Sequence, residues 1–114
     1  MKLIYKICDA ALWQKAEHHG SFTGAEIDIQ DGYIHFSTAA QVAETAEKHF
    51  RGREGLVLVA IDSERLDIRW ETSRGGDLFP HLYADLPAET AISITPMHLN
   101  EDGVPIPEGG FPGI

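Results

Sequence analysis

Six consecutive apolar residues, from Leu56 to Ile61, constrain the fold more strongly than any other segment of the chain. A short apolar run of this kind is typical of a strand that is buried on both faces. Such a strand lies inside a sheet rather than at its edge. We therefore expect residues 56–61 to form a central strand.

The first predicted helix covers residues 10–19. Leu12, Trp13 and Ala16 fall on one side of it, and Gly20 provides a stop signal. The segment before it, Leu3 to Cys8, alternates as a strand does, with successive side chains on opposite faces. The chain therefore begins with a strand followed by a helix.

A second predicted helix follows Thr38. The sequence from Thr38 to Gln41 matches a capping box, in which the two side chains satisfy backbone N–H groups at the start of a helix. Five apolar residues then share one helical face: Ala39, Val42, Ala43, Ala46 and Phe50. Gly52 ends the predicted helix.

The other predicted elements are strands and loops. The strands are expected at residues 33–37, 66–71, 78–83 and 91–99. Pro80 favours an edge position or a bulge for the third of these strands. Residues 21–32 are expected to be mostly loop, and residues 100–114, rich in Pro and Gly, an irregular tail. Helices early and a run of strands late predict an α+β fold in a single domain of residues 1–114.

Composition narrows the class of protein. The chain has 114 residues, 18 acidic against 9 basic side chains and a formal net charge of −9. Nucleic-acid binders usually carry a basic face, so this acidic chain is not expected to bind nucleic acid, and a small-molecule ligand is favoured. No apolar run approaches the ~20 residues of a membrane helix, and the N-terminal segment does not resemble a signal peptide. The single Cys8 and the absence of these signals predict a cytoplasmic location.

The densest set of polar side chains surrounds the second predicted helix start. Tyr33, His35 and Ser37 fall on one face of a strand, and Thr38 follows them. A helix N-terminus favours anions such as phosphate, and His35 can both donate and accept a proton near neutral pH. The alternative is structural: Thr38 is only a cap, and His35 is a satisfied core residue.

A second candidate constellation lies between residues 70 and 83. Glu71 and Arg74 flank a Gly-Gly loop, and His81 shares a strand face with aromatic residues. These residues can form one wall of a cleft. The structural alternative is a hairpin loop with an acidic rim.

No sequence pattern indicates a metal site or an activated nucleophile. The chain has no His-Glu-x-x-His spacing, no phosphate-binding glycine loop and no Gly-x-Ser-x-Gly elbow. We expect no bound metal. A metal-dependent hydrolase that uses His35 and His81 remains as a weaker alternative.

Several strings resemble a family of small bacterial proteins, the domain of unknown function number 952. The resemblance rests on Asp31-Gly32-Tyr33-Ile34-His35-Phe36-Ser37-Thr38 and on Phe79-Pro80-His81-Leu82-Tyr83, and it covers residues 2–99. It implies an ADP-ribosyltransferase-like fold, with two early helices packed on a mixed or antiparallel sheet of about six strands.

The resemblance also implies a type of site. Enzymes with this fold cleave the bond between nicotinamide and ribose in NAD, and they need a carboxylate on a late strand. Here that position holds Pro80 or His81, and Lys6 stands where the enzymes have His or Arg. Glu71 is the remaining candidate carboxylate.

Together these inferences predict a protein that binds a nucleotide-like small molecule, NAD or a relative, in a polar cleft. The candidate catalytic residues are His35, Glu71 and His81. The candidate ligand-binding residues are Lys6, Tyr33, Ser37, Thr38 and Arg74. Turnover of NAD is not expected. A non-catalytic protein-interaction module is the main alternative.

Overall fold

A four-stranded antiparallel sheet forms the centre of the computed structural model, which describes residues 1–112. Its strand order is β1-β4-β8-β9. The strands are β1 (Leu3–Asp9), β4 (Leu56–Asp62), β8 (Ala91–Leu99) and β9 (Pro105–Pro107). The apolar run of β4 therefore lies between two paired strands, as the sequence predicts.

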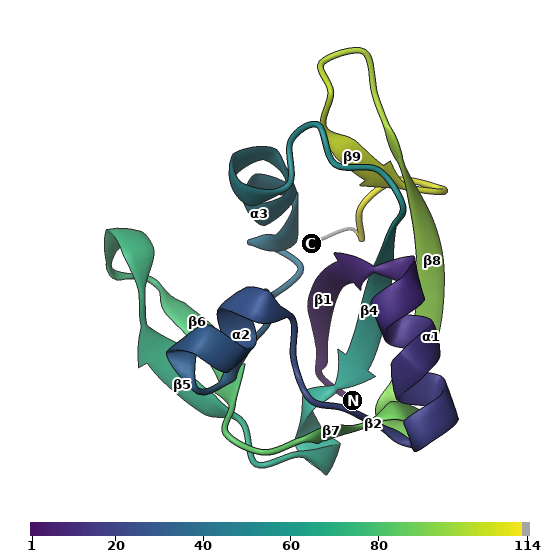
Figure 1. Cartoon of the computed structure of the whole chain (residues 1–114). Coiled ribbons are helices and arrows are strands. Elements are labelled where there is room, and N and C mark those ends of the chain that lie inside the picture. Colours follow the sequence, from purple (N-terminus) through teal and green to yellow (C-terminus); the bar gives the residue numbers. More distant parts are fainter. Residues whose placement is uncertain (113–114) are drawn as a thin grey trace.

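A second, three-stranded sheet has the order β3-β6-β5. Its strands are β3 (Ile34–His35), β6 (Leu78–Leu82) and β5 (Arg69–Thr72). Strands β5 and β6 lie to one side of the central sheet (Figure 1). The two sheets meet where Tyr5 of β1 and Ser37 exchange backbone hydrogen bonds of 2.8 and 2.9 Å. A two-stranded ribbon of β2 (Ser21–Phe22) and β7 (Leu86–Pro87) completes the strand pairings of the described chain.

Two apolar clusters cover the two faces of the central sheet. On one face, Ile4, Val59 and Ile61 pack with Trp13 of α1 (Ala10–His19). On the other face, the sheet packs against α3 (Val42–His49), which contributes Val42 and Ala46. Six of the seven β4 residues are buried, because alternate side chains enter different clusters.

Three α-helices are present among residues 1–112, one more than the sequence predicts. The additional helix is α2 (Glu26–Asp31), within a segment that the sequence assigns mostly to loop. The usual burial pattern is reversed in this helix: Ile27 and Ile29 are exposed, whereas Asp28 is buried. An apolar pattern therefore cannot reveal this helix. Gly32 ends it in the left-handed conformation, with φ of 86°, which favours glycine.

Further elements also differ from the predictions. Helix α3 starts at Val42, after a separate turn over residues 38–41. The edge position or bulge expected at Pro80 is wrong, because β6 is the middle strand of its sheet and pairs with β5 in a continuous register. Pro80 is tolerated there because β3 has only two residues, and the Pro80 carbonyl accepts a hydrogen bond from Phe36 N–H beyond its end. The expected irregular tail contains β9, and its residues 113–114 lie outside the described part.

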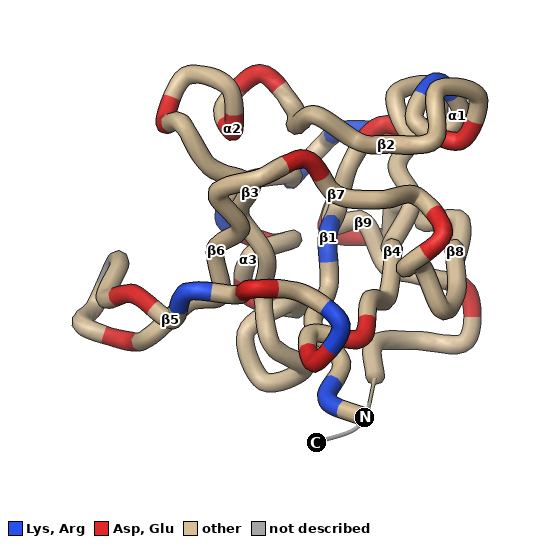
Figure 2. The backbone as a smooth tube through the Cα atoms, turned by 90° about the horizontal axis from the view of Figure 1, so that it is seen from below, with Lys and Arg blue, Asp and Glu red and all other residues tan. Residues whose placement is uncertain are grey.

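Residues 1–112 also contain three single 3-10 turns. They are η1 (Ser63–Arg65), η2 (Arg74–Gly76) and η3 (Ala88–Thr90). Acidic positions are spread over most of the chain path, as Figure 2 shows. No helix within residues 1–112 is long and apolar enough to span a membrane.

Candidate functional site

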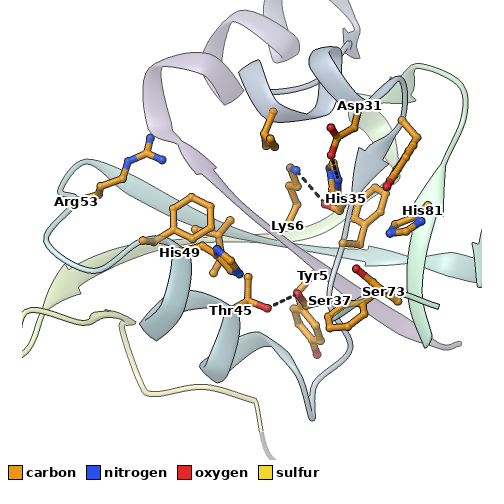
Figure 3. Close-up of a pocket in the computed structure, with 16 residues that line it drawn as sticks. Tyr5, Lys6, Asp31, His35, Ser37, Thr45, His49, Arg53, Ser73 and His81 are labelled. Carbon is orange, nitrogen blue, oxygen red and sulfur yellow. Dashed lines mark hydrogen bonds and ion pairs between the residues drawn. The ribbon is translucent and has the colours of Figure 1, made fainter. Parts of the chain in front are cut away.

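A cavity of about 520 Å³ opens where β1, the three-stranded sheet and α3 meet. Its volume lies within the range of roughly 300–1,000 Å³ that is usual for small-molecule sites. Sixteen residues line it: Tyr5, Lys6, Ile7, Ile27, Asp31, Tyr33, His35, Phe36, Ser37, Thr45, His49, Phe50, Arg53, Ser73, Phe79 and His81. The side chains of Arg53 and His49 lie on one side, and those of His35 and His81 on the other (Figure 3).

Asp28 organises the buried part of this region. Its carboxylate lies 2.7 Å from Lys6 Nζ and 2.6 Å from His35 Nδ1. It also accepts hydrogen bonds from the backbone N–H groups of Ala25, at 2.8 Å, and His35, at 3.0 Å. Because α2 and β3 are joined by a short turn, this one helix side chain can hold the start of α2 at Ala25 and the strand β3 at His35.

The charges of Lys6 and Asp28 compensate each other inside the protein. Burial lowers the pKa of Lys6, and the adjacent Asp28 carboxylate opposes that effect. Burial raises the pKa of Asp28, but hydrogen bonds and charge from His35 and Lys6 outweigh it and lower the pKa to about 2. Lys6 Nζ also donates to the carbonyl oxygen of His35 at 2.9 Å. Lys6 Nζ is therefore already bound by two groups of the protein itself, the Asp28 carboxylate and the His35 carbonyl.

His35 lies between two carboxylates. Its Nδ1 faces Asp28, and its Nε2 lies 2.9 Å from Oδ2 of Asp31, at the end of α2. Carboxylates only accept hydrogen bonds, so a ring with a proton on each nitrogen satisfies both contacts. Asp28 is inaccessible, whereas Asp31 is partly exposed at 38% of its side chain. Of the two partners, only Asp31 is placed to give way to a ligand.

His81 is held by a second carboxylate. Its Nδ1 lies 2.9 Å from Oε1 of Glu71, and the same oxygen accepts a 2.7 Å hydrogen bond from the Tyr83 hydroxyl. These two hydrogen bonds lower the pKa of Glu71, and the hydrogen bond to Glu71 raises the pKa of Tyr83. Glu71 does not line the cavity. It acts on the cavity only through His81.

Aromatic rings form one wall of the cavity. The ring centroid of Tyr33 lies 4.6 Å from that of His35, 4.2 Å from that of His81 and 5.0 Å from that of Tyr83. His35 and His81 are direct partners across β3 and β6, and their ring centroids are 5.5 Å apart. The period-2 face predicted for Tyr33, His35 and Ser37 thus faces the cavity. Ile34 and Phe36 are buried, and Phe36 also borders the cavity.

The remaining predicted site residues have different positions. Ser37 lines the cavity, and its Oγ lies 3.0 Å from Thr45 Oγ1. Thr38 does not line it: its N–H donates to Gln41 Oε1 at 3.0 Å, which is half of the predicted capping box. The helix start is therefore not part of the cavity wall. The side chain of Arg74 lies outside the described part of the structure.

Sequence reasoning missed several residues of this site. Asp28 and Asp31 lay in the supposed loop, although a Gly directly after a short polar segment is a helix-end signal. Further lining residues that were missed include Thr45, His49, Phe50, Arg53 and Ser73. They come from α3, the turn after it and the hairpin loop, and no short sequence pattern links these segments.

No group of three or more His, Cys, Asp or Glu side chains within the described residues is arranged to hold a metal ion. The two candidate metal ligands in the cavity are His35 and His81. Nδ1 of His35 faces Asp28, and Nδ1 of His81 faces Glu71.

Comparison with known proteins places the chain in a family. A family model described as "Protein of unknown function (DUF952)" matches residues 7–94. The chain belongs to the DUF952 family. This confirms the family resemblance of the sequence, whereas the ADP-ribosyltransferase-like part of that resemblance stays a prediction.

Solved structures of a bacterial protein share the fold. The crystal structure of protein CC0527 from Caulobacter crescentus has a TM-score of 0.88 and 47% sequence identity, over 90% of this chain and 92% of that chain. The solution NMR structure of CC0527 has a TM-score of 0.83 and 47% identity, over 92% of each chain. No curated protein matches the DUF952 chain.

Proposed function

We propose that the cavity of this DUF952 protein binds a small phosphate-bearing molecule of nucleotide-like build. One observation carries the proposal: the cavity gathers hydrogen-bond donors in a chain that has twice as many acidic as basic residues. Asp31 is the single carboxylate residue among the described lining residues, whereas the lining also contains three histidines, several hydroxyl side chains and Arg53. Such a lining favours an anionic ligand.

The aromatic wall supports a ligand with a flat ring. Tyr33, His81 and Phe79 line the same cavity, and the Tyr33 and His81 rings already pack against each other. Stacking of a nucleobase on an aromatic side chain contributes about 1–3 kcal/mol. A nucleobase packed against this wall would contact the apolar part of the lining.

Arg53 supports an anionic group at the other side of the cavity. Its present partner is Asp9, at 3.0 Å, in a pair whose two side chains are each about half exposed. Exposed pairs of this kind contribute about 0–1 kcal/mol, so exchanging Asp9 for a phosphate costs little. A guanidinium can bind a phosphate through two parallel hydrogen bonds. His49 lies on the same side (Figure 3).

The proposed ligands include NAD and its relatives, but the proposed function is binding rather than nicotinamide release. ADP-ribosyl chemistry needs a carboxylate beside the ribose. Glu71 is occupied by His81 and Tyr83 and does not line the cavity. This supports a site that holds a nucleotide without breaking its glycosidic bond.

Calorimetric titration of the full chain tests this proposal. We expect AMP and ADP-ribose to bind, and inorganic phosphate to bind more weakly because it lacks the ring. Arg53→Gln should weaken AMP binding about tenfold, the loss of one charged contact. Arg51→Gln is the matched control, because Arg51 bonds the carbonyl of Asp102 and does not line the cavity.

Two results would overturn the proposal. One is the absence of heat with all three ligands at millimolar concentration. The other is an equal loss of affinity in Arg53→Gln and Arg51→Gln, which would indicate a diffuse charge effect. Either result would favour a protein-interaction module.

A further inference from the structure

Two carboxylate-held histidines face the same cavity from adjacent strands. Asp28 holds Nδ1 of His35 at 2.6 Å, and Glu71 holds Nδ1 of His81 at 2.9 Å. A carboxylate on one ring nitrogen fixes the ring orientation and assigns proton exchange to the other nitrogen. In both residues that other nitrogen is Nε2.

From this pairing we infer that His35 and His81 form a proton donor and acceptor pair that hydrolyses a phosphate ester bound in the cavity. The inference rests on the proposed function for the phosphate-bearing ligand. The two residues are direct partners in the β3–β6 register, so both imidazoles reach the same ligand. Figure 3 shows both side chains on the same side of the cavity.

The two histidines have different partners, and this assigns their roles. His35 has a carboxylate at each ring nitrogen, Asp28 at Nδ1 and Asp31 at Nε2, so its contacts hold the doubly protonated ring. It is the proton donor. His81 has the Glu71 carboxylate at Nδ1, which leaves Nε2 as the proton acceptor.

The reaction balances with water as the second substrate. The oxygen of a water molecule forms a bond to phosphorus, and His81 Nε2 takes one of its protons. The bond between phosphorus and the leaving oxygen breaks, and His35 Nε2 gives its proton to that oxygen. Transfer of a proton from His81 to His35 through solvent restores the starting state. The ligand displaces Asp31 from Nε2 of His35 before the transfer.

The surrounding groups have supporting roles. Asp28 and Glu71 are positioning residues, since each acts through a histidine. Ser37 is not an obvious nucleophile, because its Oγ is paired with Thr45 Oγ1 rather than with a histidine. This favours direct attack by water over a covalent intermediate.

Hydrolysis of adenosine 2′,3′-cyclic phosphate by the full chain, followed by phosphorus NMR, tests the inference. General acid–base groups contribute about 10²–10⁴-fold to a rate. We therefore expect His35→Gln and His81→Gln to lower kcat at least 100-fold, with little change in KM. His98→Gln is the matched control: His98 also pairs with a carboxylate, Glu108 at 3.1 Å, but it does not line the cavity.

A second substrate distinguishes a proton-donor role of His35 from a purely structural role. Bis(4-nitrophenyl) phosphate has a leaving group that needs little protonation. His35→Gln should therefore lose much less activity on this ester than on the cyclic nucleotide, whereas His81→Gln should lose activity on both. An equal loss of activity on both substrates in His35→Gln would contradict the role of His35 as proton donor. Circular dichroism identifies a variant that fails to fold.

Failure of this inference is distinguishable from failure of the proposed function. If AMP binds in the cavity but neither ester is hydrolysed, the hydrolytic inference is wrong and the binding function stands. If neither binding nor hydrolysis occurs, both are wrong. Equal activity in the wild type and the two histidine variants would also contradict the inference.

Discussion

The Lys6 ammonium lies 2.7 Å from the Asp28 carboxylate, and the Lys6 and Asp28 side chains are 6% and 0% exposed. They belong to β1 and α2, and the carboxylate also holds His35. The pair therefore links the central sheet, the short helix and the candidate site. Because one carboxylate serves all three, its removal has consequences for stability and for the geometry of the cavity.

Asp28→Asn should lower the free energy of unfolding by about 3–5 kcal/mol, the usual cost of leaving a buried charge without its partner. Urea denaturation measures this change. Asp31→Asn is the control, because its side chain is 38% exposed and its loss should cost less than about 1 kcal/mol. Equal effects of the two substitutions would contradict the structural role assigned to Asp28.

Acid should destabilise the protein through the same carboxylate. Asp28 has a pKa lowered from 3.8 to about 2, so the native state binds its proton less readily than the unfolded state. The resulting stability is present above about pH 4 and is lost as the pH falls toward 2. It amounts to about 2 kcal/mol. Urea unfolding at several acid pH values checks this, and an identical pH dependence in Asp28→Asn would exclude Asp28 as the source.

A core substitution tests the central position of β4. Ile61 is fully buried, so Ile61→Ala should lower the free energy of unfolding by about 2–5 kcal/mol. Ile92→Ala is the matched control, because Ile92 is 48% exposed, and its effect should stay within about 0.5 kcal/mol. Thermal or urea unfolding measures both changes. A small effect at Ile61 would indicate that β4 is less enclosed than described.

Cys8 should be unreactive in the native protein. It is 2% exposed, and burial raises the pKa of its thiol to about 12, so almost no thiolate is present at pH 8. Reaction with a colorimetric thiol reagent should release less than a tenth of an equivalent in the native state and one full equivalent in urea. Rapid labelling without denaturant would contradict the burial of β1.

The sequence predicts the central architecture well, because there the hydrophobic pattern and the burial agree. The apolar run of β4 and the helix around Trp13 are both found where the pattern of apolar residues places them. The pattern fails at α2, where Ile27 and Ile29 are exposed and Asp28 is buried. Polar interactions rather than apolar burial fix this helix, and no periodicity records them.

The same limit applies to the candidate site. His35 and His81 stand out in the sequence, and the structure places both on the cavity. Lys6 also lines the cavity, but its charge is neutralised by Asp28, a partner 22 residues away in a presumed loop. Long-range pairing of this kind decides whether a polar residue is available to a ligand, and it depends on the fold rather than on local sequence.

The most direct test of nucleotide binding follows the imidazole proton signals of all six histidines by NMR while AMP is added. His35, His49 and His81 line the cavity, whereas His18, His19 and His98 do not and serve as internal references. We expect the first three signals to shift in a saturable way and the other three to stay in place. Unchanged signals at millimolar AMP, or equal shifts in all six, would contradict a nucleotide site in this cavity.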